Sequence, residues 1–139
     1  MTALEVAKKI AKAFEGWSPV VYLDPVGLAT IGYGHRTAVD TSPIDKVQGE
    51  AILDSDMAIS LRGAVKYCPV LLAYPERLGA IADFCFNLGV GRLQASTLRR
   101  RINQQDWTAA VKELRKWVRG GGRILPGLVA RREAESKYM

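Results

Sequence analysis

Residues 14–35 read FEGWSPVVYLDPVGLATIGYGH and contain the most β-prone part of the chain. Two segments within it, 20–22 and 29–33, have β-prone sequences, and the turn-forming stretch 24–27 separates them. That pattern predicts a β-hairpin or a small three-stranded sheet. Because a sheet of this size is not stable by itself, it must pack against helices that the rest of the chain supplies.

The segment before the predicted sheet has the pattern of an amphipathic helix. Thr2 and Glu5 form a predicted capping box, and apolar residues then recur at helical spacing as far as Phe14. Gly16 is a natural end for this helix. Glu15 is therefore expected at the C-terminal end of the first helix.

The segments after the sheet are predicted to be helical. Ser42 and Pro43 predict the start of a long helix over 43–67, because proline is favoured at the first position of a helix. Shorter helices are expected at 76–87, 96–104, 107–119 and 126–137. Helices that build the core around one small N-terminal sheet make an α+β fold.

The composition is that of one globular domain. The chain has 139 residues, of which 48% are hydrophobic and 24% charged. No apolar run approaches the roughly 20 residues that span a bilayer, and the N-terminal residues lack the pattern of an export signal. We therefore expect a soluble chain without stable membrane insertion, and two buried free thiols at Cys68 and Cys85.

The net charge of +6 is distributed unevenly. Residues 1–70 carry a net −1 and residues 71–139 a net +7, which suits a polyanionic partner such as nucleic acid, anionic lipid or an acidic cell wall. The run Arg99–Arg101 fits phosphates, but no base-reading motif or interleaved aromatic residues accompany it. The prediction is therefore that nucleic acid is not a partner; a merely solvated basic surface remains the alternative.

Three residues of the opening stretch offer catalytic groups. Glu15 follows the apolar Phe14, which would favour a protonated acid, whereas Asp24 lies in a turn where it would stay ionised. Thr30 opens the returning strand and could hold a water. Two carboxyl groups in unlike environments are what glycoside hydrolysis requires. The other interpretation is a helix-end charge and a turn-forming aspartate without catalytic roles.

The spacing of these residues resembles that of a known enzyme family. The pattern E-G-(x5)-Y-x-D-(x2)-G-(x2)-T-I-G-Y-G-H, from Glu15 to His35, is similar to that of the phage-type lysozymes, glycoside hydrolase family 24. The similarity continues along most of the chain, at Phe86–Gly89, Ser96–Leu98, Trp117 and Leu125–Glu133.

The resemblance implies an endolysin, a muramidase that hydrolyses the β-1,4 bond between N-acetylmuramic acid and N-acetylglucosamine in bacterial peptidoglycan. It also implies a single lysozyme-like domain with a catalytic cleft between two lobes. In that arrangement a sheet-bearing lobe covers about 15–42, and a joining helix covers about 43–67. A helical lobe covers about 68–139 and includes the N-terminal helix.

The resemblance also assigns roles to individual residues. Glu15 is implied to be the general acid, and Asp24 and Thr30 the pair that handles the nucleophilic water. The family is associated with inversion, which needs carboxyl groups about 6.5–9.5 Å apart. Whether Asp24 is a base or a nucleophile stays open.

Other implied roles are supporting ones. His35 is expected to pair structurally with Asp56, and Arg131 to help hold Glu15. Asn87 is expected in the cleft, where an amide suits the N-acetyl groups of a glycan; capping of a helix end is the alternative. One histidine and two distant cysteines do not form a usual metal site, so no metal or cofactor is expected.

Two other functions compete with the hydrolase. A lytic transglycosylase would act on the same bond without a catalytic water, and a non-catalytic module would only bind the wall or nucleic acid. For a muramidase we expect a monomer that stays in the host cytoplasm until lysis. It would then reach the periplasm and wall through a membrane opened by a holin.

Overall fold

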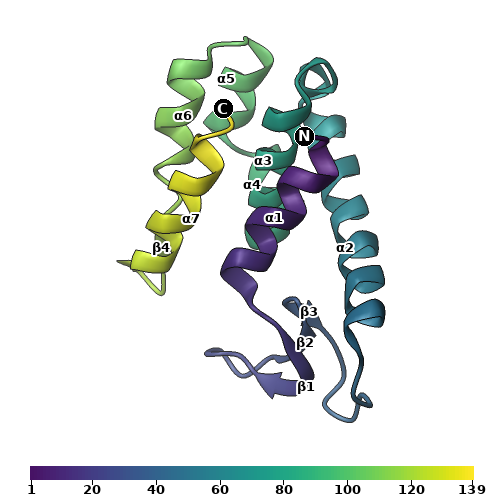
Figure 1. Ribbon diagram of the computed structural model, residues 1–139. Coiled ribbons are helices and arrows are strands. Elements are labelled where there is room, and N and C mark those ends of the chain that lie inside the picture. Colours follow the sequence, from purple (N-terminus) through teal and green to yellow (C-terminus); the bar gives the residue numbers. More distant parts are fainter.

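The computed structural model describes all 139 residues and shows a small sheet at one end of a mainly helical molecule (Figure 1). The elements, in chain order, are α1 (Ala3–Glu15), β1 (Ser18–Leu23), β2 (Ala29–Gly32), β3 (His35–Arg36), α2 (Lys46–Tyr67), the 3-10 helix η1 (Pro69–Ala73), α3 (Pro75–Leu88), α4 (Val90–Gln94), α5 (Thr97–Asn103), α6 (Trp107–Leu114), β4 (Arg119–Gly120), β5 (Arg123–Ile124) and α7 (Pro126–Ser136). The predicted α+β class, mostly helical with a small N-terminal sheet, is confirmed.

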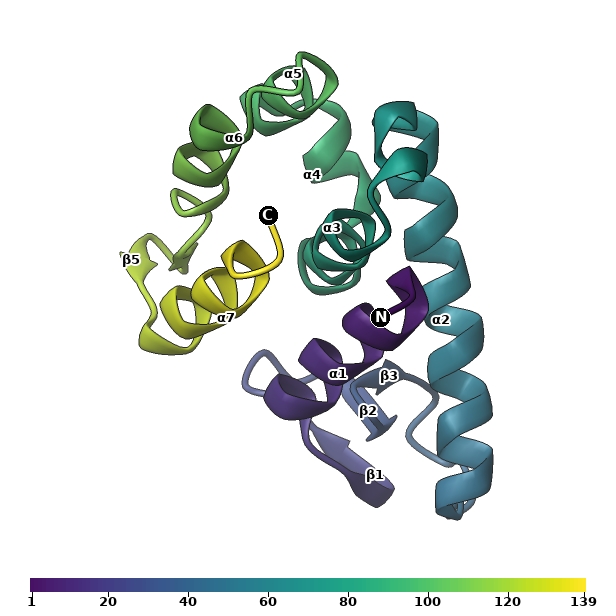
Figure 2. The same cartoon turned by 45° about the horizontal axis from the view of Figure 1, so that its top comes forward.

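Helix α1 begins and ends where the sequence predicts. The Thr2 hydroxyl accepts a hydrogen bond from the Glu5 backbone N–H at 3.1 Å, and the chain leaves the helix at Gly16 with φ of +68°. Helix α1 packs against α3, and Figure 2 shows the two helices side by side. A Cβ at Gly79 of α3 would overlap the Val6 side chain, so the two helices are in close contact.

The long helix α2 starts at Lys46, so the prediction that it starts at Pro43 is wrong. Asp45 is the N-cap, and it forms a full capping box with Gln48. The Ile44 backbone N–H donates to the Pro19 carbonyl of β1 at 2.9 Å, which ties this segment to the sheet. A helix opening at Pro43 would take that N–H away from the sheet. The end of α2 at Tyr67 agrees with the prediction.

The sheet is three-stranded and antiparallel, in the order β1-β2-β3. In its register Tyr22 lies opposite Thr30, and Thr30 lies opposite Arg36. Directly opposed residues point to the same face of a sheet, so these three side chains form one row across it. Trp17, which precedes β1, contacts Gly49 of α2, where a Cβ would overlap the indole ring. The sheet is thereby fixed against α2.

The C-terminal half differs from the prediction in three places. The helix expected over 107–119 ends at Leu114, and the chain then forms the hairpin β4–β5, whose turn residues Gly121 and Gly122 have φ of +58° and +80°. The short helices η1 and α4 were not predicted. The remaining helices lie within a few residues of their predicted bounds, and Asp106 caps α6 as expected.

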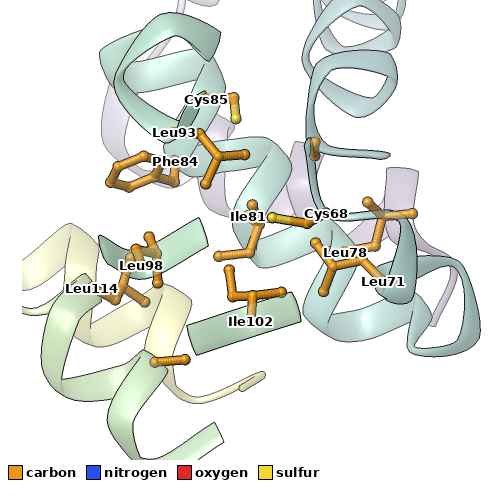
Figure 3. Close-up of a cluster of buried hydrophobic side chains, with 12 residues drawn as sticks. Cys68, Leu71, Leu78, Ile81, Phe84, Cys85, Leu93, Leu98, Ile102 and Leu114 are labelled. Carbon is orange, nitrogen blue, oxygen red and sulfur yellow. The ribbon is translucent and has the colours of Figure 1, made fainter. Parts of the chain in front are cut away.

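The largest core cluster surrounds α3 and contains residues of α2 and η1, which precede it, and of α4, α5 and α6, which follow it (Figure 3). Phe84 and Ile81 of α3 meet Leu98 and Leu114 from α5 and α6. The same cluster contains Cys68 and Cys85, which are buried free thiols as predicted. Burial raises the pKa of Cys68 to about 11 and that of Cys85 to about 12. None of the helices has the length and apolar character needed to cross a bilayer.

Replacing Asp45 with alanine should lower the free energy of unfolding by about 1 kcal/mol, because the N-cap of α2 loses its side-chain acceptor. Ser42→Ala is the matched control, since Ser42 lies outside the helix. Urea denaturation of the two variants measures the difference. A larger loss for Ser42→Ala would place the start of the helix at Pro43 after all.

Candidate active site

A cleft of about 440 Å³ lies where the end of α1, the β2–β3 turn, the middle of α2 and the end of α3 meet. Its lining residues come from five segments of the chain: Glu15, Gly34, His35, Arg36, Asp56, Ile59, Ser60, Cys85, Phe86, Asn87, Gly89 and Val90. Four of the predicted site residues therefore share one cavity: Glu15, His35, Asp56 and Asn87.

Glu15 is held by a buried arginine from the other end of the chain. Its Oε1 accepts a hydrogen bond from Arg131 Nη1 of α7 at 2.7 Å. Arg131 Nε and Nη2 donate to the two carboxylate oxygens of Asp83 in α3, at 2.9 and 2.8 Å. The Asp83 side chain is 0% exposed and that of Glu15 is 24% exposed. The Arg131–Asp83 pair is therefore fixed inside the protein, whereas Glu15 faces the cleft.

The contact between Arg131 and Glu15 is the one that the resemblance implies, but the predicted apolar wall beside Glu15 is not found. The sequence predicts an apolar wall from Phe14, but the guanidinium of Arg131 lies over the Phe14 ring, 5.6 Å from its centroid, and itself contacts Glu15. On the other side Gly34, with φ of +74°, passes so close that a Cβ there would overlap Glu15 Oε2. Only glycine therefore fits at this point of the β2–β3 turn.

His35 and Asp56 both line the cleft, and their side chains contact each other. His35 Nδ1 of β3 is 2.7 Å from Asp56 Oδ2 of α2. The pair links the sheet to the long helix, as expected for a supporting role.

Asp24 is held by backbone groups and by one arginine. Its Oδ1 accepts from the N–H groups of Val26 and Leu28 at 3.0 and 2.8 Å, and its Oδ2 accepts from the Arg36 guanidinium. Arg36 first, and then the Leu28 N–H, hold the pKa of Asp24 below its ordinary value. Asp24 is therefore an ionised carboxylate, in agreement with its predicted environment.

Asp24 and Thr30 are not among the residues that line the cleft. Thr30 is buried in β2, and its hydroxyl donates to the Leu28 carbonyl at 3.0 Å. Arg36 does line the cleft, and it is bonded to Asp24 and lies in the same row as Thr30. The sequence pattern gave no indication of this linking role of Arg36.

Asn87 lies at the edge of the cleft, and its orientation is set from inside the protein. Its Oδ1 accepts from Nη2 of the fully buried Arg132 at 2.6 Å. Because a guanidinium can only donate, the amide must present its oxygen to Arg132 and its NH₂ group elsewhere. The C-cap of α3 is Gly89, so Asn87 does not have the alternative role of capping this helix.

Arg132 and Asn87 belong to a buried polar cluster that the sequence did not reveal. Arg132 Nη2 also donates to Glu135 Oε2 at 3.1 Å, and both side chains are completely buried. Burial, and then the neighbouring Asp83, raise the pKa of Glu135 well above its ordinary value. The dipeptide Arg131–Arg132 sits in the sequence pattern that resembles lysozymes, but nothing in the sequence marks Asp83 as its partner.

The arginine run of α5 has structural contacts of its own. Arg99 donates to the carbonyls of Tyr67 and Gln94 at 3.0 and 3.1 Å, and its guanidinium stacks on the Tyr67 ring. None of Arg99–Arg101 lines the cleft.

Comparison with known proteins identifies the family. Residues 12–135 match the family model described as phage lysozyme. The chain belongs to the phage lysozyme family.

Its relatives agree with that assignment. The chain is 38% identical over 117 residues to the SAR-endolysin of Bacteriophage PS34. The aligned region covers 82% of this chain and 69% of that protein. It is 38% identical over 124 residues to the SAR-endolysin of Enterobacteria phage P21, covering 87% and 74%. The structure of the active form of the P1 phage endolysin Lyz has the same fold, with a TM-score of 0.87 at 20% identity, covering 96% of this chain and 82% of that one. The protein is a phage-type lysozyme, an enzyme that lyses peptidoglycan.

Replacing Arg36 with glutamine should lower the melting temperature at pH 6, because Asp24 loses the main group that holds its pKa down. A depressed folded-state pKa stabilises the fold above the unfolded value of about 3.9, and that stability is lost as pH falls through the folded pKa. The difference between variant and wild type should therefore shrink from pH 6 to pH 2.5. Arg123→Gln, an exposed arginine without an ion pair, is the control. A difference that is constant with pH would exclude the Asp24 contact as its cause.

Replacing Arg131 with glutamine should cost about 3–5 kcal/mol of unfolding free energy, because it leaves the carboxylate of Asp83 buried without a counter-charge. The double variant Arg131→Gln/Asp83→Asn removes both charges and should be more stable than the single variant. Urea denaturation of both variants measures this. If the double variant is the less stable one, the buried charge is not what destabilises the single variant.

Proposed function

We propose that this phage lysozyme hydrolyses the β-1,4 bond between N-acetylmuramic acid and N-acetylglucosamine, with Glu15 as the general acid. The observation that carries the proposal is the position of the Glu15 carboxyl group. It faces a cleft, and Arg131 on one side and the Gly34 backbone on the other restrict it. A general acid must be held at the leaving oxygen in this way to transfer its proton efficiently.

In this proposal Asp24 and Thr30 hold the attacking water; neither residue lines the cleft itself, and Arg36, which does line it, is bonded to Asp24 and connects the pair to it. The hydroxyl proton of Thr30 is committed to the Leu28 carbonyl, so its oxygen can only accept a hydrogen bond from a water. The carboxylate of Asp24 can only accept as well while it is ionised. A water that donates to both would direct a lone pair toward the sugar.

The reaction then balances with these three groups. Glu15 gives its proton to the glycosidic oxygen as the bond to the muramic acid anomeric carbon breaks. The water oxygen bonds to that carbon, and the water proton passes to Asp24. Proton exchange with solvent returns Glu15 to its acid form and Asp24 to its carboxylate.

Other residues have supporting roles in the proposal. The His35–Asp56 pair keeps the sheet side of the cleft fixed to α2, and Asn87 donates from its NH₂ group to an N-acetyl carbonyl of the glycan. The chain acts as a single catalytic domain and as a monomer. We also propose that it stays in the host cytoplasm until a holin opens the membrane, and cell fractionation before lysis checks that location.

Glu15→Gln should fold like the wild type but lose at least ~100-fold in rate, the scale of general acid catalysis, because an amide has no proton of suitable acidity to give. Mass analysis of the fragments released from purified sacculi measures the rate and the product. Hydrolysis adds one water to each cleaved bond, whereas a lytic transglycosylase would give an anhydro product. Glu5→Gln, at the other end of α1, is the matched control. Near-normal lysis by folded Glu15→Gln, or an anhydro product from the wild type, would contradict the proposal.

A further inference from the structure

The cleft contains one nearly buried hydroxyl group that the proposed reaction does not use. Ser60 of α2 is only 5% exposed, and it is one of the residues that line the cleft. The fully buried side-chain atoms that lack a hydrogen-bond partner belong to Arg132 and Glu135. The hydroxyl of Ser60, which bonds to no group of the protein, is therefore open to the cleft.

The part of α2 that carries Ser60 is fixed on both sides. Asp56 lies one turn earlier on the same face of the helix, and its carboxylate is engaged by His35 of the sheet. Gly63 lies one turn later, so close to Val90 of α4 that a Cβ would overlap the Val90 side chain. Ser60 therefore has a fixed place in the cleft wall. Because a buried hydroxyl without a partner is unfavourable, a bound substrate group that supplies the missing hydrogen bond is favoured there.

Asn87 presents the complementary group from the end of α3. Its amide oxygen is bonded inside the protein, so the NH₂ group, a donor only, is the part left for a ligand in the same cleft. Ile59, Phe86 and Val90 add apolar side chains to the lining. With the hydroxyl on α2, the cleft offers a donor, an acceptor and an apolar surface. An acetamido group matches this set, because its carbonyl accepts, its N–H donates and its methyl group is apolar. A sugar hydroxyl has no methyl group.

We propose that Ser60 is a specificity-determining residue, whose hydroxyl oxygen accepts a hydrogen bond from the N–H of one acetamido group of the glycan while Asn87 donates to the carbonyl of the same group. The inference rests on the proposed function, since it takes the cleft to hold the glycan. A sugar with a protonated free amine offers donors only, so it leaves the NH₂ group of Asn87 without an acceptor. The enzyme therefore prefers an N-acetylated sugar at this position.

The test uses soluble glycan strands that have been partly and randomly deacetylated, so that each cut selects between N-acetylated and free-amine sugars. The variant is Ser60→Ala, which removes only the hydroxyl group. The matched control is Ser55→Ala, an exposed serine of the same helix that lies outside the cleft. Sequencing of the fragments by mass spectrometry gives the ratio of N-acetylated to free-amine sugars at each position relative to the cut.

Wild type and Ser55→Ala should show the same enrichment of N-acetylated sugars at one position beside the cut. Ser60→Ala should lose about fivefold of that enrichment, the scale of one neutral hydrogen bond, and should leave the other positions unchanged. A merely structural role of Ser60 would lower kcat/KM on fully acetylated strands without changing the enrichment. That result, or a wild type without a preference at any position, would overturn the inference.

The same fragments test the proposed function separately. Fragments that carry one added water for each cut keep the proposed function standing, whatever the enrichment. Anhydro ends, or a wild type that does not cleave fully acetylated strands, would contradict the proposed function itself.

Discussion

The geometry of the cleft depends on one guanidinium group. Arg131 lies inside the protein, where an unpaired charge would be strongly destabilising, and its three bonded nitrogens satisfy Glu15 and both oxygens of Asp83. These contacts join the end of α1, the middle of α3 and helix α7. Glu15 and Arg131 are 116 residues apart in the chain, so the carboxyl group reaches its final position only when the C-terminal helix has docked.

The sheet forms the side of the cleft that faces Arg131 and Glu15, and its contacts are of a different kind. Gly34 brings backbone rather than a side chain against Glu15, whereas Asp24 is fixed by turn N–H groups and by Arg36. The two carboxyl groups therefore differ in what surrounds them. Glu15 contacts an arginine buried in the core, and Asp24 contacts an exposed arginine together with its own turn. At the α3 side of the cleft, Arg132 fixes the orientation of Asn87.

Features that depend on local sequence were predictable, and those that depend on distant contacts were not. The caps at Thr2 and Asp106 act through backbone groups three residues away, so short patterns reveal them. The predicted start of α2 was wrong because Pro43 and Asp45 are both typical of the start of a helix. The choice between them involves the hydrogen bond from Ile44 to β1, which the local sequence does not show.

The candidate site shows the same division. Glu15, Asp24 and Thr30 lie in one short segment of the sequence, and the resemblance to lysozymes identifies all three by their spacing. Asp83 and Arg132 act only through the packing of α3 against α7, and no local pattern marks a buried aspartate or arginine as a partner. The hairpin β4–β5 was missed for another reason, because strands of only two residues each are too short to show an alternating pattern.

Cys68 and Cys85, the two free thiols of the chain, are both buried in the core. Burial raises the pKa of Cys68 to about 11 and that of Cys85 to about 12, so both thiols are protonated at neutral pH. Thiol–disulfide exchange requires a thiolate that a partner can reach, and both sulfur atoms lie in the core. Both thiols should therefore resist disulfide formation and exchange, under oxidising as well as under reducing conditions.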